Sequence, residues 1–246
     1  MRRFTTALAC TLAAAQGCRT MTPAEAAQAA PVVLFDGTAL DAFDIFLREK
    51  GLNSDPDRVF RVENGVIRVT GTEHGYFITK RSFRNYRLHA EFKWGEGTFG
   101  NKTGKARDSG ILYHMQGPHK VWPRSLELQI QEGATGDFWM TDSAAVTGRS
   151  GVRVVGPAGN SRPIARFGKG AWRDVIDYRD PNGEIERPRG EWNEIELVAR
   201  GDTVQHYVNG KLVNEGTQPF PREGRIVFQS EGAELFFRNI VLYPLP

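Results

Sequence analysis

The sequence predicts an all-β protein of the sandwich or barrel type, and three observations support this. From Pro31 onward, short runs of alternating apolar and polar residues are separated by Gly, Pro, Asn and Asp. Two of the gaps are Asn-Gly pairs, which suit the left-handed backbone conformations of a two-residue hairpin turn. No amphipathic helix stands out after the first thirty residues. Short strands at regular spacing with turn residues between them are typical of these two architectures.

The predicted strands follow from these patterns. Residues 58–61 and 66–69 flank the turn Asn64-Gly65, and residues 203–208 and 211–213 flank the turn Asn209-Gly210. Residues 86–94 alternate strictly, so their apolar side chains share one face of a strand and their charged side chains the other. Further strands are predicted at 110–115, 126–131, 194–199, 225–229 and 234–242.

A segment of weak periodicity lies between Gln131 and Trp192. It is rich in Gly, Arg and Pro, and a loop of such length in a compact domain is usually functional or disordered. It also contains Trp139, Trp172 and Tyr178. Because disordered segments are poor in aromatic residues, we expect part of this segment to be ordered.

The first thirty residues have the pattern of a targeting segment. Arg2 and Arg3 precede an apolar run at 4–15, which is too short to span a bilayer, and residues 27–29 offer an A-x-A cleavage site. Alternatively, residues 15–18 resemble a bacterial lipoprotein cleavage box, in which Cys18 would carry a lipid anchor. Both interpretations predict an exported protein, periplasmic or anchored to the envelope of a bacterium. Residues 31–246 then form a single domain.

Charge and cysteine content exclude several classes of function. The net charge is only +3 and basic residues are scattered among acidic ones, whereas nucleic-acid binders concentrate basic residues on one patch. We therefore expect no nucleic-acid partner. Both cysteines, Cys10 and Cys18, lie in the predicted leader. The folded part therefore has no disulfide, thiolate metal site or cysteine nucleophile.

Seven short segments resemble, in the same order, a family once called domain of unknown function 1080 and now described as 3-keto-disaccharide hydrolases. They are residues 34–38 (LFDGT), 60–67 (FRVENGVI), 108–111 (DSGI), 127–130 (ELQI), 190–193 (GEWN), 208–210 (VNG) and 237–240 (FRNI). The resemblance implies a concanavalin A-like jelly roll, with sugar bound on the concave side. A two-sheet antiparallel β-sandwich is therefore the expected fold.

The same resemblance implies cleavage of glycosides already oxidised at C3 of the sugar. A carbonyl at C3 acidifies the hydrogen on C2, so a base can remove it and the group at C1 can leave by elimination, after which water adds. His114 stands where many members of the family have an Arg, and the insertion after residues 136–139 indicates a subgroup. The alternative is a lectin-like envelope domain that binds carbohydrate without cleaving it, because a fold does not determine function.

One predicted strand carries the main candidate residue. Glu127, Gln129 and Gln131 alternate with Leu126, Leu128 and Ile130, and a period of two places the polar side chains on one face. If that face borders the groove, Glu127 can act as a general acid or base, and Gln129 can bind sugar hydroxyls. The plain alternative is a solvated strand face with no role.

The remaining candidates are weighed in the same way. His114 is expected to share a face with Gly110 and Leu112 and to move protons, unless it is only structural. Glu91 and Lys93 either line the groove or form a solvated pair. Asp108 orients the sugar or a cation, or is a turn residue, and Trp139 stacks on a sugar or packs in the core. No metal motif is present, but a divalent ion could stabilise the enolate.

Overall fold

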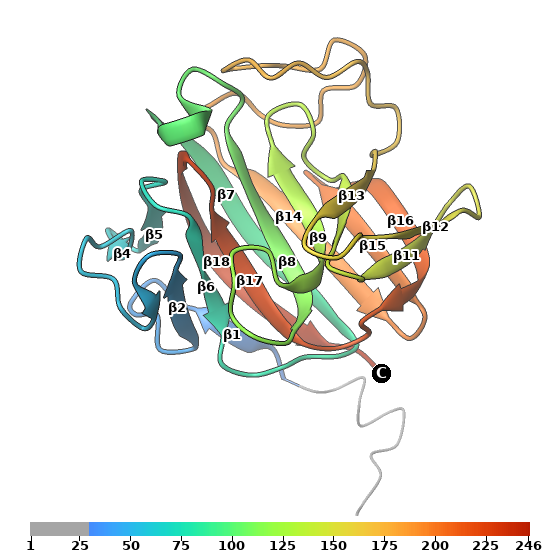
Figure 1. Cartoon of the computed structure of the whole chain (residues 1–246), viewed down its shortest axis with the longest axis horizontal. Helices are drawn as coiled ribbons and strands as arrows, with labels where there is room; N and C mark the ends of the chain where they lie inside the picture. Colours follow the sequence, from blue (N-terminus) through green and yellow to red (C-terminus); the bar gives the residue numbers. More distant parts are fainter. Residues whose placement is uncertain (1–29) are drawn as a thin grey trace, which may run out of the picture.

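Residues 30–246 form two antiparallel β-sheets packed face to face (Figure 1), as the computed structural model shows. This confirms the expected all-β sandwich. The predicted leader, with Cys18, lies outside the described residues. Within those residues the only helical element is the 3₁₀ turn η1 (Gly100–Lys102), and no helix is long and apolar enough to cross a membrane.

The first sheet has ten strands in the order β12-β11-β16-β15-β14-β7-β18-β5-β4, with β1 paired to β18. Their bounds are β1 Val32–Phe35, β4 Phe60–Glu63, β5 Val66–Val69, β7 Tyr86–Thr98, β11 Ala145–Gly148, β12 Arg153–Val155, β14 Asn193–Arg200, β15 Thr203–Val208, β16 Lys211–Phe220 and β18 Ala233–Pro244.

The second sheet has eight strands in the order β13-β10-β9-β8-β17-β6-β2-β3. Their bounds are β2 Phe43–Leu47, β3 Gly51–Leu52, β6 Gly75–Thr79, β8 Asp108–Gln116, β9 Arg124–Gln131, β10 Phe138–Thr141, β13 Ser161–Ile164 and β17 Arg225–Ser230. The irregular segment 165–192 runs along one end of the sandwich (Figure 1, amber).

The core fills the space between the sheets. Phe77 of β6 and Phe228 of β17 stack with ring centroids 4.7 Å apart, and Phe237 of β18 meets Phe228 edge to face at 5.3 Å. All three side chains are fully buried. Burial of apolar side chains is the main stabilising contribution in a domain without disulfides. The outer faces of the sheets are thereby free to carry polar side chains.

Both predicted Asn-Gly hairpins are present. Asn64 and Gly65 have φ of 50° and 79°, and Asn209 and Gly210 have φ of 48° and 76°, so both turns use the left-handed region that these residues tolerate. The segment between Gln131 and Trp192 contains four strands that its periodicity did not predict. Each is only three or four residues long, which is too short for a periodic pattern to emerge.

Candidate functional site

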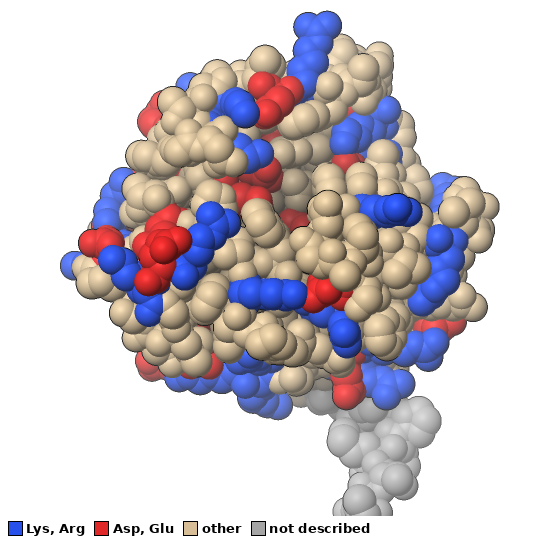
Figure 2. Space-filling view, in the orientation of Figure 1, with Lys and Arg blue, Asp and Glu red and all other residues tan. Residues whose placement is uncertain are grey.

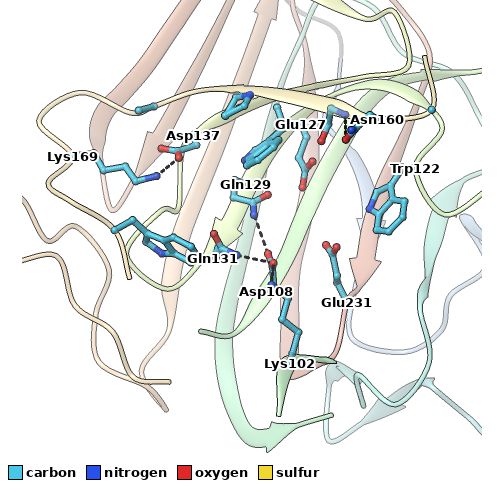
Figure 3. A pocket seen from close by; sticks show the side chains of 16 residues that line it. Lys102, Asp108, Trp122, Glu127, Gln129, Gln131, Asp137, Asn160, Lys169 and Glu231 are labelled. Atoms are coloured by element: carbon cyan, nitrogen blue, oxygen red, sulfur yellow. Dashed lines mark hydrogen bonds and ion pairs between the residues drawn. The ribbon is translucent and has the colours of Figure 1, made fainter. Parts of the chain in front are cut away.

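A cavity of about 550 Å³ opens on the face of the eight-stranded sheet that is turned away from the core. Figure 2 shows this hollow, with acidic side chains at its bottom. Strands β8, β9 and β10 form its floor, and segments around Trp122, 159–172 and Glu231 form its walls (Figure 3). The cavity therefore combines side chains that are distant in sequence.

Strand β9 places three predicted residues on the cavity floor. Leu126, Leu128 and Ile130 are buried in the core between the sheets, so the alternating Glu127, Gln129 and Gln131 face the cavity. The sequence-based prediction of this polar face is therefore confirmed as geometry. Glu127 lies against Gly110 of β8, where a Cβ atom would fall 2.1 Å from the Glu127 Oε1. Only glycine leaves room for the carboxyl group in that position.

Asp108, the first residue of β8, is held by three donors. The Nε2 of Gln129 donates to its Oδ1 at 2.9 Å, the Nε2 of Gln131 donates to its Oδ2 at 2.7 Å, and Lys102 forms an ion pair with it. Burial raises the pKa of Asp108 to about 6, while Lys102 and Gln131 oppose the rise. At neutral pH Asp108 is therefore mainly the ionised partner of Lys102.

Glu231 is the acidic residue that the sequence analysis missed. It follows β17 directly and lines the same cavity (Figure 3). Burial, with the charge of Asp108 adding to it, raises the pKa of Glu231 to about 8. In the sequence it lies between Ser230 and Gly232, which is the pattern of an ordinary surface turn. Only its position at the end of a predicted strand next to the site could have indicated a role.

The pKa of Glu127 is raised well above that of an exposed glutamate. Burial is the main cause, and the charges of Glu231 and Asp108 add to it. In the described residues no group donates a hydrogen bond to the Glu127 carboxyl group. The raised pKa favours the protonated form of Glu127, and a second buried carboxyl group with a raised pKa, Glu231, lines the same cavity.

Three tryptophans line the cavity. Trp139 of β10 lies directly across from Glu127 of β9, so the segment predicted to be irregular is here a strand of the cavity floor. Its Nε1–H is buried and finds no acceptor among residues 30–246. Trp172 donates its own Nε1–H to the carbonyl of Glu132 at 2.9 Å, and Trp122 is 43% exposed at the rim. The cavity thus offers aromatic faces and one free donor.

Buried ion pairs hold the far wall in place. Asp137 accepts a hydrogen bond from the backbone N–H of Arg166 at 2.7 Å and pairs with Lys169, which lines the cavity. The guanidinium of Arg166 donates to Asp180 at 2.7 Å, and both side chains are 1% exposed. The wall is therefore held by ion pairs and hydrogen bonds outside the apolar core.

The structure does not bring His114 into the cavity. A β-bulge between Tyr113 and Gln116 shifts the alternation, and His114 adopts φ 56°. Its ring packs edge to face against Tyr86 and Tyr113, and its Nδ1–H donates to the carbonyl of Pro221 at 2.9 Å. Burial lowers the pKa of His114 to about 4. The expected convergence with Glu127 was wrong, because the bulge turns the imidazole inward.

Glu91 and Lys93 are also remote from the cavity. Their strand, β7, belongs to the ten-stranded sheet, and Glu91 pairs with Arg238 while Lys93 lies 5.2 Å from the Trp192 ring centroid. The alternation of β7 was predicted correctly, but its polar face points away from the cavity, on the opposite side of the sandwich. The expectation that these two residues line the groove was therefore wrong.

The side chains of the described residues that could together bind a metal ion lie outside the cavity. In residues 30–246, the only group of at least three such side chains with ligand atoms within 4.8 Å of one another is His89, Glu194 and Glu196. It lies on β7 and β14, in the ten-stranded sheet. In the cavity, the carboxyl group of Asp108 is already partnered by Lys102 and by the amides of Gln129 and Gln131.

Comparison with known proteins supports the fold and identifies the family. Residues 30–242 match the family described as the 3-keto-alpha-glucoside-1,2-lyase-like domain. A search of curated protein sequences returns no significant match. Among solved structures, a candidate glycosyl hydrolase from Parabacteroides distasonis is similar, with a TM-score of 0.56 and 19% identity over 92% of this chain and 99% of that one.

Two further structures show the same fold. A second candidate glycosyl hydrolase from Parabacteroides distasonis has a TM-score of 0.55 and 20% identity, covering 88% of this chain and 100% of its own. A structure described under endo-acting O-glycanases of the human gut microbiota has a TM-score of 0.51 and 14% identity, covering 87% of this chain and 100% of its own. Since the family match spans almost all of the described residues, this chain belongs to the carbohydrate-active family of 3-keto-alpha-glucoside-1,2-lyase-like domains.

Proposed function

We propose that the protein cleaves the glycosidic bond of 3-keto-glycosides by proton abstraction and elimination, followed by addition of water. The observation that carries this proposal is the meeting of Glu127 and Glu231 in one cavity, where burial raises the pKa of both and the nearby charge of Asp108 adds to the rise. Two buried carboxyl groups in one cavity can divide the roles of acid and base. The family membership supports the same reaction class.

In the proposed division of roles, Glu231 is the base and Glu127 is the acid. Glu231, with a pKa of about 8, takes the hydrogen from C2 of the keto-sugar when it is ionised. The electron pair of the C2–H bond forms a C1=C2 double bond, and the C1–O bond breaks. Glu127 still carries its proton at that point and gives it to the departing oxygen.

Donors around these two groups can stabilise the negative charge that develops on the C3 oxygen. The Nε1–H of Trp139 is unpartnered among the described residues, and the ammonium group of Lys102 faces the same cavity. A donor that is already in position stabilises an enolate without reorganisation. Gln129 and Asp108, which are hydrogen-bonded to each other, then position the sugar hydroxyls.

The test is turnover of 3-keto-glucosides by the purified protein in D₂O, with unoxidised glucosides as the comparison. Elimination through C2 places deuterium at that carbon in recovered substrate or product, whereas direct hydrolysis does not. We expect Glu127→Gln and Glu231→Gln each to lower kcat by about 10²–10⁴-fold, the usual contribution of a general acid or base. Glu223→Gln, at an exposed loop position, is the matched control and should retain full turnover.

A second candidate function is carbohydrate binding without cleavage, favoured by the three tryptophans that line the cavity. Calorimetric titration separates the two functions. Binding of an unoxidised disaccharide together with complete inertness toward the keto form would establish the lectin-like function instead. Export to the periplasm or envelope, based on residues 1–30, remains part of the proposal. Fractionation of the native host tests it.

A further inference from the structure

The side chains of Glu127 and Gln229 both lie over Gly110. A Cβ atom on Gly110 would lie 2.1 Å from the Glu127 Oε1 and 2.5 Å from the Gln229 Oε1. Gln229 belongs to β17, which pairs with β8 on the side opposite to β9. The two oxygens therefore lie at most about 4.6 Å apart, on the two strands that flank β8, over a residue that has no side chain.

The amide oxygen of Gln229 is an unexplained acceptor. Gln229 is 2% exposed, and its Oε1 is buried without a hydrogen-bond partner in the described part of the chain. Ser109 Oγ–H donates to the backbone carbonyl of Gln229 at 3.0 Å, not to its amide. An unpaired buried acceptor costs about 1–3 kcal/mol. The nearby Glu127 oxygen cannot relieve this cost as a carboxylate, because it is then also an acceptor.

We propose, resting on the function proposed above, that Gln229 is a positioning residue whose Oε1 accepts the hydrogen of the Glu127 carboxyl group. Gly110 leaves the space in which the two side chains meet. The contact keeps Glu127 in its acid form and fixes its plane while the cavity is empty. When substrate enters, the leaving oxygen replaces Gln229 as acceptor, and the proton passes from Glu127 to that oxygen as the C1–O bond breaks.

The orientation of the Gln229 amide follows from the state of Glu127. With Nε2 turned toward Glu127, the amide would donate to the carboxylate and favour its ionisation. Burial and the charges of Glu231 and Asp108 act in the other direction and raise the pKa of Glu127. A neutral carboxyl group facing Oε1 satisfies both side chains at once.

The decisive experiment titrates Glu127 directly. Proteins labelled with ¹³C at the glutamate side-chain carboxyl are followed by NMR, and the Glu127 signal is the one absent from Glu127→Gln. In Gln229→Met, which keeps side-chain length but removes the acceptor, we expect the pKa of Glu127 to fall by about one pH unit, the size of a single hydrogen bond. The matched control Gln205→Met, on the ten-stranded sheet, should leave it unchanged.

Kinetics give a second readout. The alkaline limb of kcat should move to lower pH in Gln229→Met, while KM changes less than about twofold because Gln229 does not line the cavity. An unchanged or raised pKa of Glu127 in this variant overturns the proposal. If Gln229→Met does not fold, Gln229→Glu is the variant to titrate. A second acid in contact with Glu127 must raise the pKa of Glu127, so a lower pKa excludes the contact. The NMR titration stands even if no keto-glycoside is turned over, so the two proposals fail separately.

Discussion

His114 illustrates how a single backbone conformation decides the use of a side chain. Its φ of 56° and its burial against Tyr86 and Tyr113 make it a packing residue. We predict that His114→Asn, which tolerates the left-handed conformation, keeps kcat within about twofold. The free energy of unfolding should drop by about 2 kcal/mol, because ring contacts and the hydrogen bond to Pro221 are lost. Urea denaturation and keto-glycoside turnover measure these two values. A large loss of kcat at unchanged stability would show that His114 takes part in catalysis.

Prediction from sequence succeeded at residues whose strand is uninterrupted. The side chains of Glu127, Gln129 and Gln131 follow the pleat of β9, so a period of two is sufficient to place them. The same rule failed for His114, because a bulge adds one residue to the count and nothing in the residues around it marks that position. Glu231 was missed because a glutamate before a glycine in a turn looks solvated.

At the scale of elements, segment 165–192 contains a fully buried ion pair, Arg166–Asp180. We predict that Arg166→Met lowers the free energy of unfolding by about 3 kcal/mol, because it leaves the buried carboxylate of Asp180 without its counter-ion. KM should rise, since Lys169 and Trp172 of this segment line the cavity. Limited proteolysis should cut within 165–192 before any other part.

The controls for this prediction use the same chemistry elsewhere. Arg162→Met, at an exposed position of β13, should change neither stability nor KM. The double variant Arg166→Met/Asp180→Leu should recover part of the lost stability, because it removes the unpaired charge as well. Equal KM values for wild type and Arg166→Met would show that the segment does not hold the substrate.

Element prediction was limited by what local patterns contain. The alternation of residues 86–94 gave the correct two faces of β7, but it does not say which sheet the strand joins. Glu91 and Lys93 were therefore assigned to the wrong side of the sandwich. Strand β10 is four residues long and carries Trp139 beside Glu127. The pairing of β10 with β9 is a tertiary contact, and a run of four residues does not predict it.

At the scale of the whole molecule, buried titratable groups set an acidic optimum of stability. Burial lowers the pKa of His114 to about 4 and of His206 to about 3, from 6.5. The unfolded chain therefore binds protons that the folded chain does not, and stability is lost as pH falls below 6.5. Glu231, raised from 4.5 to about 8, holds its proton when folded, so stability is lost as pH rises from 4.5 to 8.

The free energy of unfolding should therefore be largest between about pH 4.5 and 6.5, the ordinary pKa values of Glu and His. Each group contributes a slope of up to about 1.4 kcal/mol per pH unit. Urea denaturation from pH 4 to 9 measures the curve. Glu127→Gln/Glu231→Gln should flatten its alkaline side, and a steeper alkaline decline in that variant would contradict the raised pKa values of these two groups.

The global architecture was the most predictable level, because strand patterning and seven short segments agree on a two-sheet sandwich. The cavity was not predictable as a volume. Its walls come from residues near 122, 159–172 and 231, which meet only because β10, β9, β8 and β17 are neighbours in one sheet. Such neighbourhoods arise from the order of strands, which no single segment encodes.

The division of the cavity into a sheet-borne floor and a loop-borne wall has an evolutionary consequence. The acids sit on strands, or directly after one, whose register is shared with the entire second sheet, so their spacing changes only if the sandwich itself changes. Segment 165–192 contains no strand, so it can be exchanged with little effect on the register of those strands, provided that Asp137 keeps a cationic partner. Relatives that exchange this segment should keep the bond-breaking step and differ in the sugar they accept.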